Sequence, residues 1–362
     1  MAESSRPSPP LVKGRGATNA GLSARFDDKA RESDGDWLDA REDIDGEGPP
    51  LRTEVTIETP RTIITRNQSP DIAFDRSINA YRGCEHGCIY CFARPTHAYQ
   101  NLSPGLDFET KLFAKPTAAA LLRKELAKPS YRCEPMALGT NTDPYQPIEE
   151  RYRITREILE VLSEHDHPVV ITTKSARILR DLDLLGPMAA KGLAAVMMSV
   201  TTLDPALARR MEPRASAPAR RIGAIAALSR AGVRTSVSVS PIVPAINDHE
   251  IEAIVAAGAE AGAKSAFSIV VRLPHEVAPL FREWLAVHYP DRAAKVMAMI
   301  AAMRGGRDNN PDFFDRFRPQ GAYAAALQAR FKLACRKHGL NVERFGARTD
   351  LFRVPTDQLN LF

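Results

Sequence analysis

The feature that most constrains this chain is a regular alternation of short apolar runs with helical patterns between residues 77 and 275. Between the runs, apolar residues recur at helical spacing, as Ile154, Ile158 and Leu162 do. Such alternation predicts a parallel sheet with right-handed crossovers. The expected fold is therefore α/β, an open or partial (β/α)6 barrel of the TIM type, with function at the strand ends. The six expected strands are 77–81, 136–139, 169–172, 194–201, 233–239 and 267–271.

The segments outside the alternation have different compositions. The first 50 residues are rich in Gly, Pro, Ser and charge, which predicts an arm that is disordered or ordered only by docking, and residues 14–19 within it are expected to be solvated. We expect one helix to end near residues 186–187 and another to begin with Asp248 as its cap. The chain thus divides into an arm (1–50), an extension (51–76), the barrel (77–275), a helical basic extension (276–350) and an exposed tail (351–362).

Bulk composition limits the cellular setting. The chain has no run of about 18 apolar residues and no apolar stretch near Met1, so we expect a cytoplasmic protein without a membrane partner. Five cysteines, three of them clustered, do not form a disulfide framework, and in a reducing compartment a cluster indicates metal binding or catalysis. The net charge of +5 permits an anionic partner without requiring one.

Three cysteines fall within eight residues, in the segment Cys84-Glu-His-Gly-Cys-Ile-Tyr-Cys91. A cube of four irons needs four ligands, so three thiols would leave one iron open to a substrate or cofactor. Gly83 and Gly87 allow the loop to wrap such a cluster closely. The alternative is a structural zinc ion with His86 as the fourth ligand. His86 lies two residues from each of the first two cysteines, which is cramped for tetrahedral convergence.

This segment resembles the cluster motif of the radical S-adenosylmethionine (SAM) superfamily, CxxxCxφC, in which φ is aromatic and is here Tyr90. The alternation that follows resembles that superfamily's partial (β/α)6 barrel. Further stretches are similar to the group related to spore photoproduct lyase, often described as DNA-repair-photolyase-like. These stretches are 75–79, 140–147, 172–175, 212–214 and 272–274.

The resemblance implies a 4Fe–4S cluster held by Cys84, Cys88 and Cys91, with SAM at the open iron. An electron from a flavodoxin- or ferredoxin-type donor would cleave SAM to methionine and a 5′-deoxyadenosyl radical, which abstracts hydrogen from the substrate. Photoproduct lyase has a hydrogen-donating cysteine near the end of its second strand. Here that region is Leu138-Gly-Thr-Asn141, and Cys133 lies at the start of the strand, so that reaction is not carried over.

By position, the resemblance places further residues in the SAM pocket. Asn141 and Asp143 suit the SAM ammonium group, although an Asx turn is an equal alternative. Lys174 suits the SAM carboxylate, unless it is an exposed lysine. Ser199 and Thr201 end the fourth strand, where contacts with the ribose or carboxylate arise.

Four other positions have weaker support. Arg214 is expected to be a second carboxylate clamp or an ion pair with Glu212, and Arg272 to flank the adenine. Residues 94–97 and 107–109 are expected to face the substrate, with a helix-surface position as the alternative for His97.

The C-terminal part is basic and aromatic. Residues 304–353 contain eleven Lys or Arg and five acids, interleaved with aromatic side chains, a composition typical of proteins that bind single-stranded nucleic acid. The alternative, which the modest charge excess favours, is a helical extension with Phe packed inward and Arg in solvent.

The last five residues resemble the peptide by which bacterial replication and repair proteins dock on the sliding clamp. An extended tail would offer apolar side chains to a pocket and a glutamine as polar anchor. The alternative is a tail folded back on the barrel. The residues concerned are Gln358, Leu359, Leu361 and Phe362.

Three functions therefore remain open. The first is a radical SAM enzyme acting on nucleic acid, as in DNA repair. The second is a radical SAM enzyme that modifies a protein, peptide or small metabolite. The third is a non-catalytic metal protein that binds nucleic acid or a partner.

Overall fold

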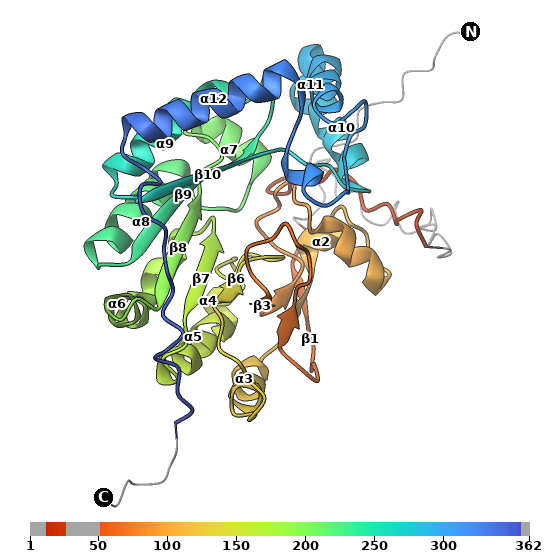
Figure 1. The fold of residues 1–362 in the computed structure, drawn as a ribbon. Coiled ribbons are helices and arrows are strands. Elements are labelled where there is room, and N and C mark those ends of the chain that lie inside the picture. The colour runs from red at the N-terminus through yellow and green to blue at the C-terminus, as the bar shows by residue number, and fades with distance from the viewer. Residues whose placement is uncertain (1–11, 27–50, 356–362) are drawn as a thin grey trace, which may run out of the picture.

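The computed structural model describes residues 12–26 and 51–355. Its main element is a seven-stranded sheet in the order β10-β9-β8-β7-β6-β3-β2 (Figure 1). From β3 to β10 neighbouring strands pair in parallel, and β2 (Ile64–Arg66) pairs antiparallel at the edge. The expected α/β partial barrel is confirmed. Its parallel strands are β3 (Arg76–Ile78), β6 (Met136–Leu138), β7 (Val169–Thr173), β8 (Ala194–Ser199), β9 (Arg234–Ile242) and β10 (Ser265–Val270).

Helices connect these strands and cover one face of the sheet (Figure 1). The longer connecting helices are α3 (Ala118–Leu126), α5 (Ile154–Glu164), α6 (Leu182–Ala190), α7 (Pro205–Met211), α8 (Pro218–Arg230) and α9 (Ile251–Glu260). The shorter ones are η1 (Arg94–Gln100), α2 (Asp107–Thr110), α4 (Glu149–Tyr152), η2 (Ala176–Asp181) and η3 (Asp248–Glu250). The C-terminal extension contains α10 (Val277–His288), α11 (Pro290–Ala302), η4 (Asp315–Phe317) and α12 (Gly321–Lys337).

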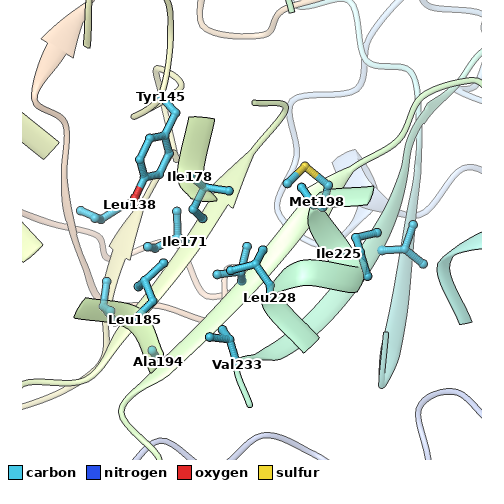
Figure 2. Packing of buried hydrophobic residues seen from close by; sticks show 14 of the residues in the cluster. Leu138, Tyr145, Ile171, Ile178, Leu185, Ala194, Met198, Ile225, Leu228 and Val233 are labelled. Atoms are coloured by element: carbon cyan, nitrogen blue, oxygen red, sulfur yellow. The ribbon is translucent and has the colours of Figure 1, made fainter. Parts of the chain in front are cut away.

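The period of two along each strand separates core from site. Ile171 on β7 and Met198 on β8 are fully buried against the helices, where they join Leu185 of α6 and Leu228 of α8 (Figure 2). Alternate residues point to the opposite face of the sheet. Polar residues such as Thr172 are frequent on that face, so polar side chains are available there to line a site.

Three local predictions were wrong. The strand expected at 77–81 is two strands, because Tyr81–Arg82 (β4) pairs with β5 (Lys111–Ala114) in a second sheet that also contains β1 (Glu54–Ile57). Helix α6 continues through Pro187 to Ala190, and Met188, just beyond the proline, is buried against the sheet. Asp248 does not cap α9, because its carboxylate accepts a hydrogen bond from the Tyr323 hydroxyl.

Both described ends of the chain pack on the barrel. Residues 15–18 are buried, so the stretch expected to be a solvated arm is docked. At the other end, residues 341–353 cross the amino ends of the strands, where the Arg353 amide bonds to His165 O at 3.0 Å (Figure 1). Phe352 packs against His165 and His167. The described residues include no helix with the length and apolar character needed to cross a bilayer.

Candidate functional site

The three clustered cysteines line one cavity at the carboxyl ends of the strands. Cys84 and Cys88 are each 7% exposed, and Cys91 is half-buried. The cavity is completed by residues that follow β6, β7 and β8. These include Gly139, Thr140, Asn141, Thr142, Asp143, Thr172, Thr173, Lys174 and Ser199.

The backbone of the cysteine loop depends on two glycines and two anchors. Gly83 and Gly87 have φ of 71° and 66°, a region that other residues rarely adopt. The Cys84 amide donates to Phe108 O at 2.9 Å. Gln146, in the loop after β6, donates its amide to Gly83 O at 3.2 Å and accepts the next amide of the cysteine loop, that of residue 85, at 2.9 Å. The glutamine thereby joins the two loops that face the cavity.

A fully buried ion pair supports the loop from behind. Arg94 Nη2 lies 2.5 Å from Glu109 Oε1, and both side chains are 0% exposed. Arg94 also donates to Cys88 O at 2.9 Å. Glu109 accepts the backbone amides of Gly16 and Ala17, each at 2.9 Å. The expectation that Arg94 and Glu109 face the substrate was therefore wrong, because they bind the cysteine loop to the docked N-terminal segment.

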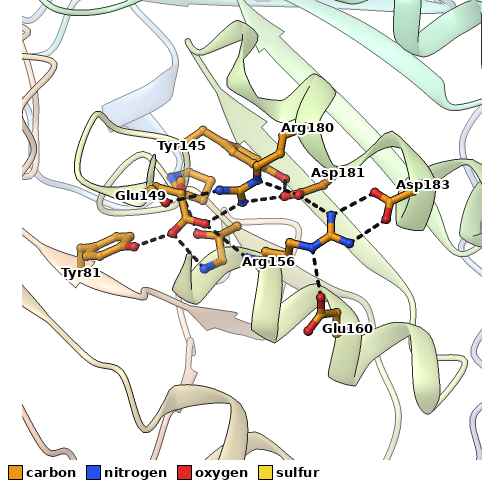
Figure 3. Close-up of polar contacts among 10 residues, drawn as sticks. Tyr81, Tyr145, Glu149, Arg156, Glu160, Arg180, Asp181 and Asp183 are labelled. Atoms are coloured by element: carbon orange, nitrogen blue, oxygen red, sulfur yellow. Dashed lines mark hydrogen bonds and ion pairs between the residues drawn. The ribbon is translucent and has the colours of Figure 1, made fainter. Parts of the chain in front are cut away.

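A second buried network fixes the strand that enters the cysteine loop (Figure 3). The Tyr81 hydroxyl donates to Glu149, which also accepts from Arg180 at 2.7 Å. Arg180 contacts Asp181 at 2.8 Å, and Tyr145, in the loop after β6, donates to Asp181 at 3.1 Å. Because buried charges are stable only when paired, this network holds the two loops in one relative position.

A third network lies between the cysteine loop and the end of β8. Glu212 accepts hydrogen bonds from Tyr90 and Thr201 and forms a buried ion pair with Arg221 of α8. Burial opposes ionisation of Glu212, but the positive charges of Arg221 and Lys174 hold its pKa below the ordinary value. Glu212 is therefore a buried carboxylate next to the cysteines.

Lys174 and Asp143 are charged within the cavity wall. Burial disfavours the Lys174 ammonium, but its acidic neighbours, among them Glu212 and Asp143, outweigh burial and raise its pKa. Burial also disfavours the Asp143 carboxylate, yet His86 and hydrogen bonds from Thr173 and the Lys174 amide lower its pKa to about 2. By contrast, burial raises the pKa of the Cys88 thiol to about 12, so the thiol is protonated until a metal displaces the proton.

The predicted SAM-pocket residues divide into three groups. Asn141, Asp143, Lys174 and Ser199 line the cavity with the cysteines. Tyr90 and Thr201 do not line the cavity but meet on the Glu212 carboxylate. Arg214 lies 3.2 Å from Glu85. Its expected ion pair with Glu212 was wrong, because Arg221 occupies that position.

The comparisons with known proteins identify the family. Residues 78–257 match the model described as the radical SAM superfamily. The chain belongs to the radical SAM superfamily. An uncharacterized protein of Mycobacterium tuberculosis (strain ATCC 25618 / H37Rv) is 36% identical over 273 residues, which span 74% of this chain and 78% of that protein. An uncharacterized protein of Methanocaldococcus jannaschii is 27% identical over 173 residues, which span 48% of this chain and 62% of that protein.

Solved structures show the same fold. A spore photoproduct lyase complexed with dinucleoside spore photoproduct aligns with a TM-score of 0.55 and 14% identity, over 79% of this chain and 80% of that one. A mutant of that lyase with bound AdoMet and dinucleoside spore photoproduct gives a TM-score of 0.54. Radical SAM proteins use a 4Fe–4S cluster and SAM, so the cofactors predicted from the sequence are confirmed.

The residues present fit a radical SAM cluster. In the described residues, no group of three or more His, Cys, Asp or Glu is placed to hold a single metal ion. A cube of four irons offers a separate iron to each cysteine, so its ligands need not converge on one point. His86 Nδ1 lies 3.4 Å from Asp143 Oδ2, and both ring nitrogens are buried without a hydrogen-bond partner in that part of the chain. The lack of a group that could hold one metal ion, in the part of the chain that the structure describes, favours a cluster over the alternative of one zinc ion with His86.

Sequence reasoning missed the residues that support the site. Arg221 and Gln146 were not predicted, and Arg94 was given a different role; each acts through a hydrogen-bond partner outside its own motif. Gln146 lies in a stretch that the family resemblance highlighted, so that one signal was available. Asp143 was assigned two alternatives, and its bond from the Tyr145 amide at 2.9 Å supports the Asx turn.

Proposed function

We propose that this chain is a radical SAM enzyme in which the three cysteines of the loop ligate the cluster. One observation carries the proposal: a single cavity is lined by all three thiols and by Asn141, Lys174 and Ser199 from the ends of neighbouring strands. When bound and reduced, the cluster supplies the electron that cleaves SAM to methionine and a 5′-deoxyadenosyl radical. The chain's own part is to bind and orient SAM and to exclude water.

The side chains of the cavity suit the polar groups of SAM. The Asn141 backbone amide donates to Asn79 Oδ1 at 3.1 Å, but its side-chain amide forms no hydrogen bond with another described residue, so the side-chain oxygen is available to accept from the SAM ammonium. Lys174 is a half-buried cation that can pair with the SAM carboxylate. Ser199 is 4% exposed and lies between this pair and β9.

The substrate that we propose is nucleic acid, in a repair-like reaction. Two observations support it: a solved structure with this fold holds a dinucleoside photoproduct, and exposed aromatic residues with arginines follow α11. We do not propose the lyase reaction itself. Residues 139–141 contain no cysteine, and Cys133 precedes β6, at the opposite end of that strand. A protein, peptide or small-metabolite substrate is the alternative.

The test is reductive SAM cleavage under anaerobic conditions. The protein is reconstituted with iron and sulfide and reduced chemically or with a flavodoxin- or ferredoxin-type donor, and methionine and 5′-deoxyadenosine are then quantified. Wild type should produce both, and Cys88→Ala neither. Cys133→Ala, at the far end of β6, should behave as wild type. Neither product from a fully reduced, iron-replete wild type would contradict the proposal and favour a non-catalytic metal protein.

We also propose that the C-terminal tail docks on a sliding clamp, although Gln358, Leu359, Leu361 and Phe362 lie outside the described residues. The path of the chain supports this, because residues 341–353 cross the amino ends of the strands, opposite the cysteine loop. Deleting the last two residues should abolish binding to purified clamp in a pull-down and leave SAM cleavage unchanged. Unchanged clamp binding would refute the idea.

A further inference from the structure

The face of β9 and β10 that is turned away from the helices leaves apolar side chains in solvent. On β10, Ala266 and Val270 are buried in the main core, whereas Phe267 and Ile269 are 51% and 39% exposed. Phe267 pairs in register with Ser238 of β9, so it lies on the same face as that serine. An exposed phenylalanine within a strand, on the inner face of a barrel, calls for a partner that covers it.

Arginine side chains gather where β10 ends. The Arg272 guanidinium lies 4.6 Å over the ring of Phe317, and Arg316 lies 5.1 Å over the same ring. Arg304 is 5% exposed and donates to Val271 O at 2.7 Å. Two guanidinium groups thus lie over one aromatic ring, and Arg304 is joined to them by a bond from Nη1 to Arg316 O at 3.3 Å.

Only part of this positive charge is neutralised. Arg316 pairs with Asp71 at 2.7 Å. Arg272 has no hydrogen-bond or ion-pair partner among residues 12–26 and 51–355, and the Nε atoms of Arg272 and Arg304 are buried and unpartnered. Burial, together with the neighbouring Arg316 and Arg304, lowers the pKa of Arg272 to about 10. Such a site suits an anion.

The segment after α11 extends the same chemistry along the surface. Phe313 and Phe314 are 55% and 46% exposed, and Arg316 and Arg318 lie over their rings at 5.0 and 6.0 Å. The prediction that phenylalanines of this region pack inward is therefore wrong for these two. Arginines interleaved with exposed aromatic rings are typical of surfaces that bind single-stranded nucleic acid, since every base has a face that can stack.

We propose that Arg272, just after β10, and Phe267 and Ile269 on β10 form a subsite for a single-stranded nucleic acid substrate. The guanidinium binds a phosphate, for which its planar fork is suited, and the apolar pair packs against a base. Arg272 does not line the cavity of the cysteines, so its expected place beside the adenine of SAM is replaced by a role toward the substrate. This inference rests on the proposed function, because it assumes a nucleic acid substrate.

The experiment measures binding of a fluorescein-labelled oligothymidylate to the full-length chain by fluorescence anisotropy at several salt concentrations. Arg272→Gln should raise Kd about ten-fold and reduce the slope of log Kd against log salt by about one. Phe267→Ala should also raise Kd about ten-fold. Arg272→Lys, which keeps the charge but loses the fork, should fall between wild type and Arg272→Gln. Arg330→Gln, in an exposed pair on α12, is the matched control and should bind as wild type.

Three results would overturn the subsite: no binding by wild type, equal Kd for Arg272→Gln and Arg330→Gln, or displacement by polyglutamate as effective as by unlabelled oligonucleotide. Binding does not require SAM cleavage, so the two proposals fail separately. Arg272-dependent binding without SAM cleavage would refute the proposed radical chemistry and leave the subsite standing. SAM cleavage without Arg272-dependent binding would remove the subsite alone.

Discussion

The inner face of the sheet has two unlike halves. Where β6, β7 and β8 end, the cysteine loop is surrounded by paired charges, and Glu212 and Arg221 are each at most 2% exposed. Where β9 and β10 end, the same face leaves Phe267 at 51% exposure and Arg272 without an acceptor among the described residues. In the first half the buried charges of Glu212, Arg221 and Arg94 are paired, and in the second an apolar ring and a cation are left without a partner in the described residues.

The contrast separates a site that the chain completes by itself from a site that a ligand must complete. Buried charges are tolerated only with partners, so the half around the cysteines is held in one arrangement before any cofactor binds. An exposed aromatic ring and a guanidinium without an acceptor, both at one strand, are stabilised by a ligand that covers them. We therefore assign the first half to the cofactors and the second to the substrate.

The largest effect that sharpens this contrast is expected at Glu212. Glu212→Gln leaves Arg221 buried without a counter-charge, which costs about 3–5 kcal/mol of the free energy of unfolding. Urea denaturation of the apo protein measures the loss. Glu252→Gln, which breaks an exposed pair with Arg330, should cost less than about 1 kcal/mol. Equal losses of unfolding free energy in the Glu212 and Glu252 variants would show that the charges around the cysteines stabilise the fold no more than an exposed pair does.

A smaller effect is expected from pH, at the amino end of β7. His167 Nε2 accepts from the Tyr131 hydroxyl at 2.7 Å, while Nδ1 donates to Pro168 O at 2.9 Å, so the ring is neutral. Burial lowers the pKa of His167 to about 4, below the unfolded value of about 6.5. The folded protein thus binds this proton less readily than the unfolded chain. Its contribution is present above pH 6.5 and lost as pH falls toward 4.

The size of that contribution follows from the shift. It amounts to about 3 kcal/mol, at 1.36 kcal/mol per pKa unit. Between pH 7 and 4, the free energy of unfolding of wild type should fall by about this much more than that of His167→Gln, measured in urea at each pH. If the free energies of unfolding of wild type and His167→Gln fell in parallel with pH, the stability of the fold at the amino end of β7 would not depend on the neutral imidazole.

The smallest effect concerns the docked N-terminal segment, which closes the cofactor half from outside. A Cβ on Gly16 would lie 1.8 Å from Gly87 O, so Gly16→Ala must displace the segment and break its two bonds to Glu109. Losing two such bonds should speed tryptic cleavage after Arg15 by about ten-fold or more. Gly21→Ala meets only Asn19 Oδ1, at 3.4 Å, and should be cleaved as wild type. Equal cleavage rates would mean that the segment does not depend on this contact.

The sequence predicted what local patterns encode. The cysteine spacing, the strand alternation and the positions of Asn141, Lys174 and Ser199 at strand ends were all visible, because parallel strands bring their carboxyl ends to one edge. The docking of Gly16 on Glu109 joins residues 93 apart, and no periodicity signals such a contact.

The second half was harder to predict for a different reason. Basic and aromatic composition in residues 304–353 fits both a packed helical extension and a binding surface, and only the exposure of particular side chains separates the two. Phe352 packs against His167, whereas Phe313 is 55% exposed. Composition gives the number of aromatic and basic residues, whereas the fold determines which of their side chains are exposed to solvent.

Hydrogen transfer tests the central claim, that radical chemistry in the cofactor half acts on nucleic acid held by the other half. Reduced wild type is incubated with SAM and a fully deuterated single-stranded oligonucleotide, and 5′-deoxyadenosine is analysed by mass spectrometry. The account predicts 5′-deoxyadenosine that carries deuterium from the oligonucleotide. 5′-Deoxyadenosine formed in quantity but free of deuterium would contradict it.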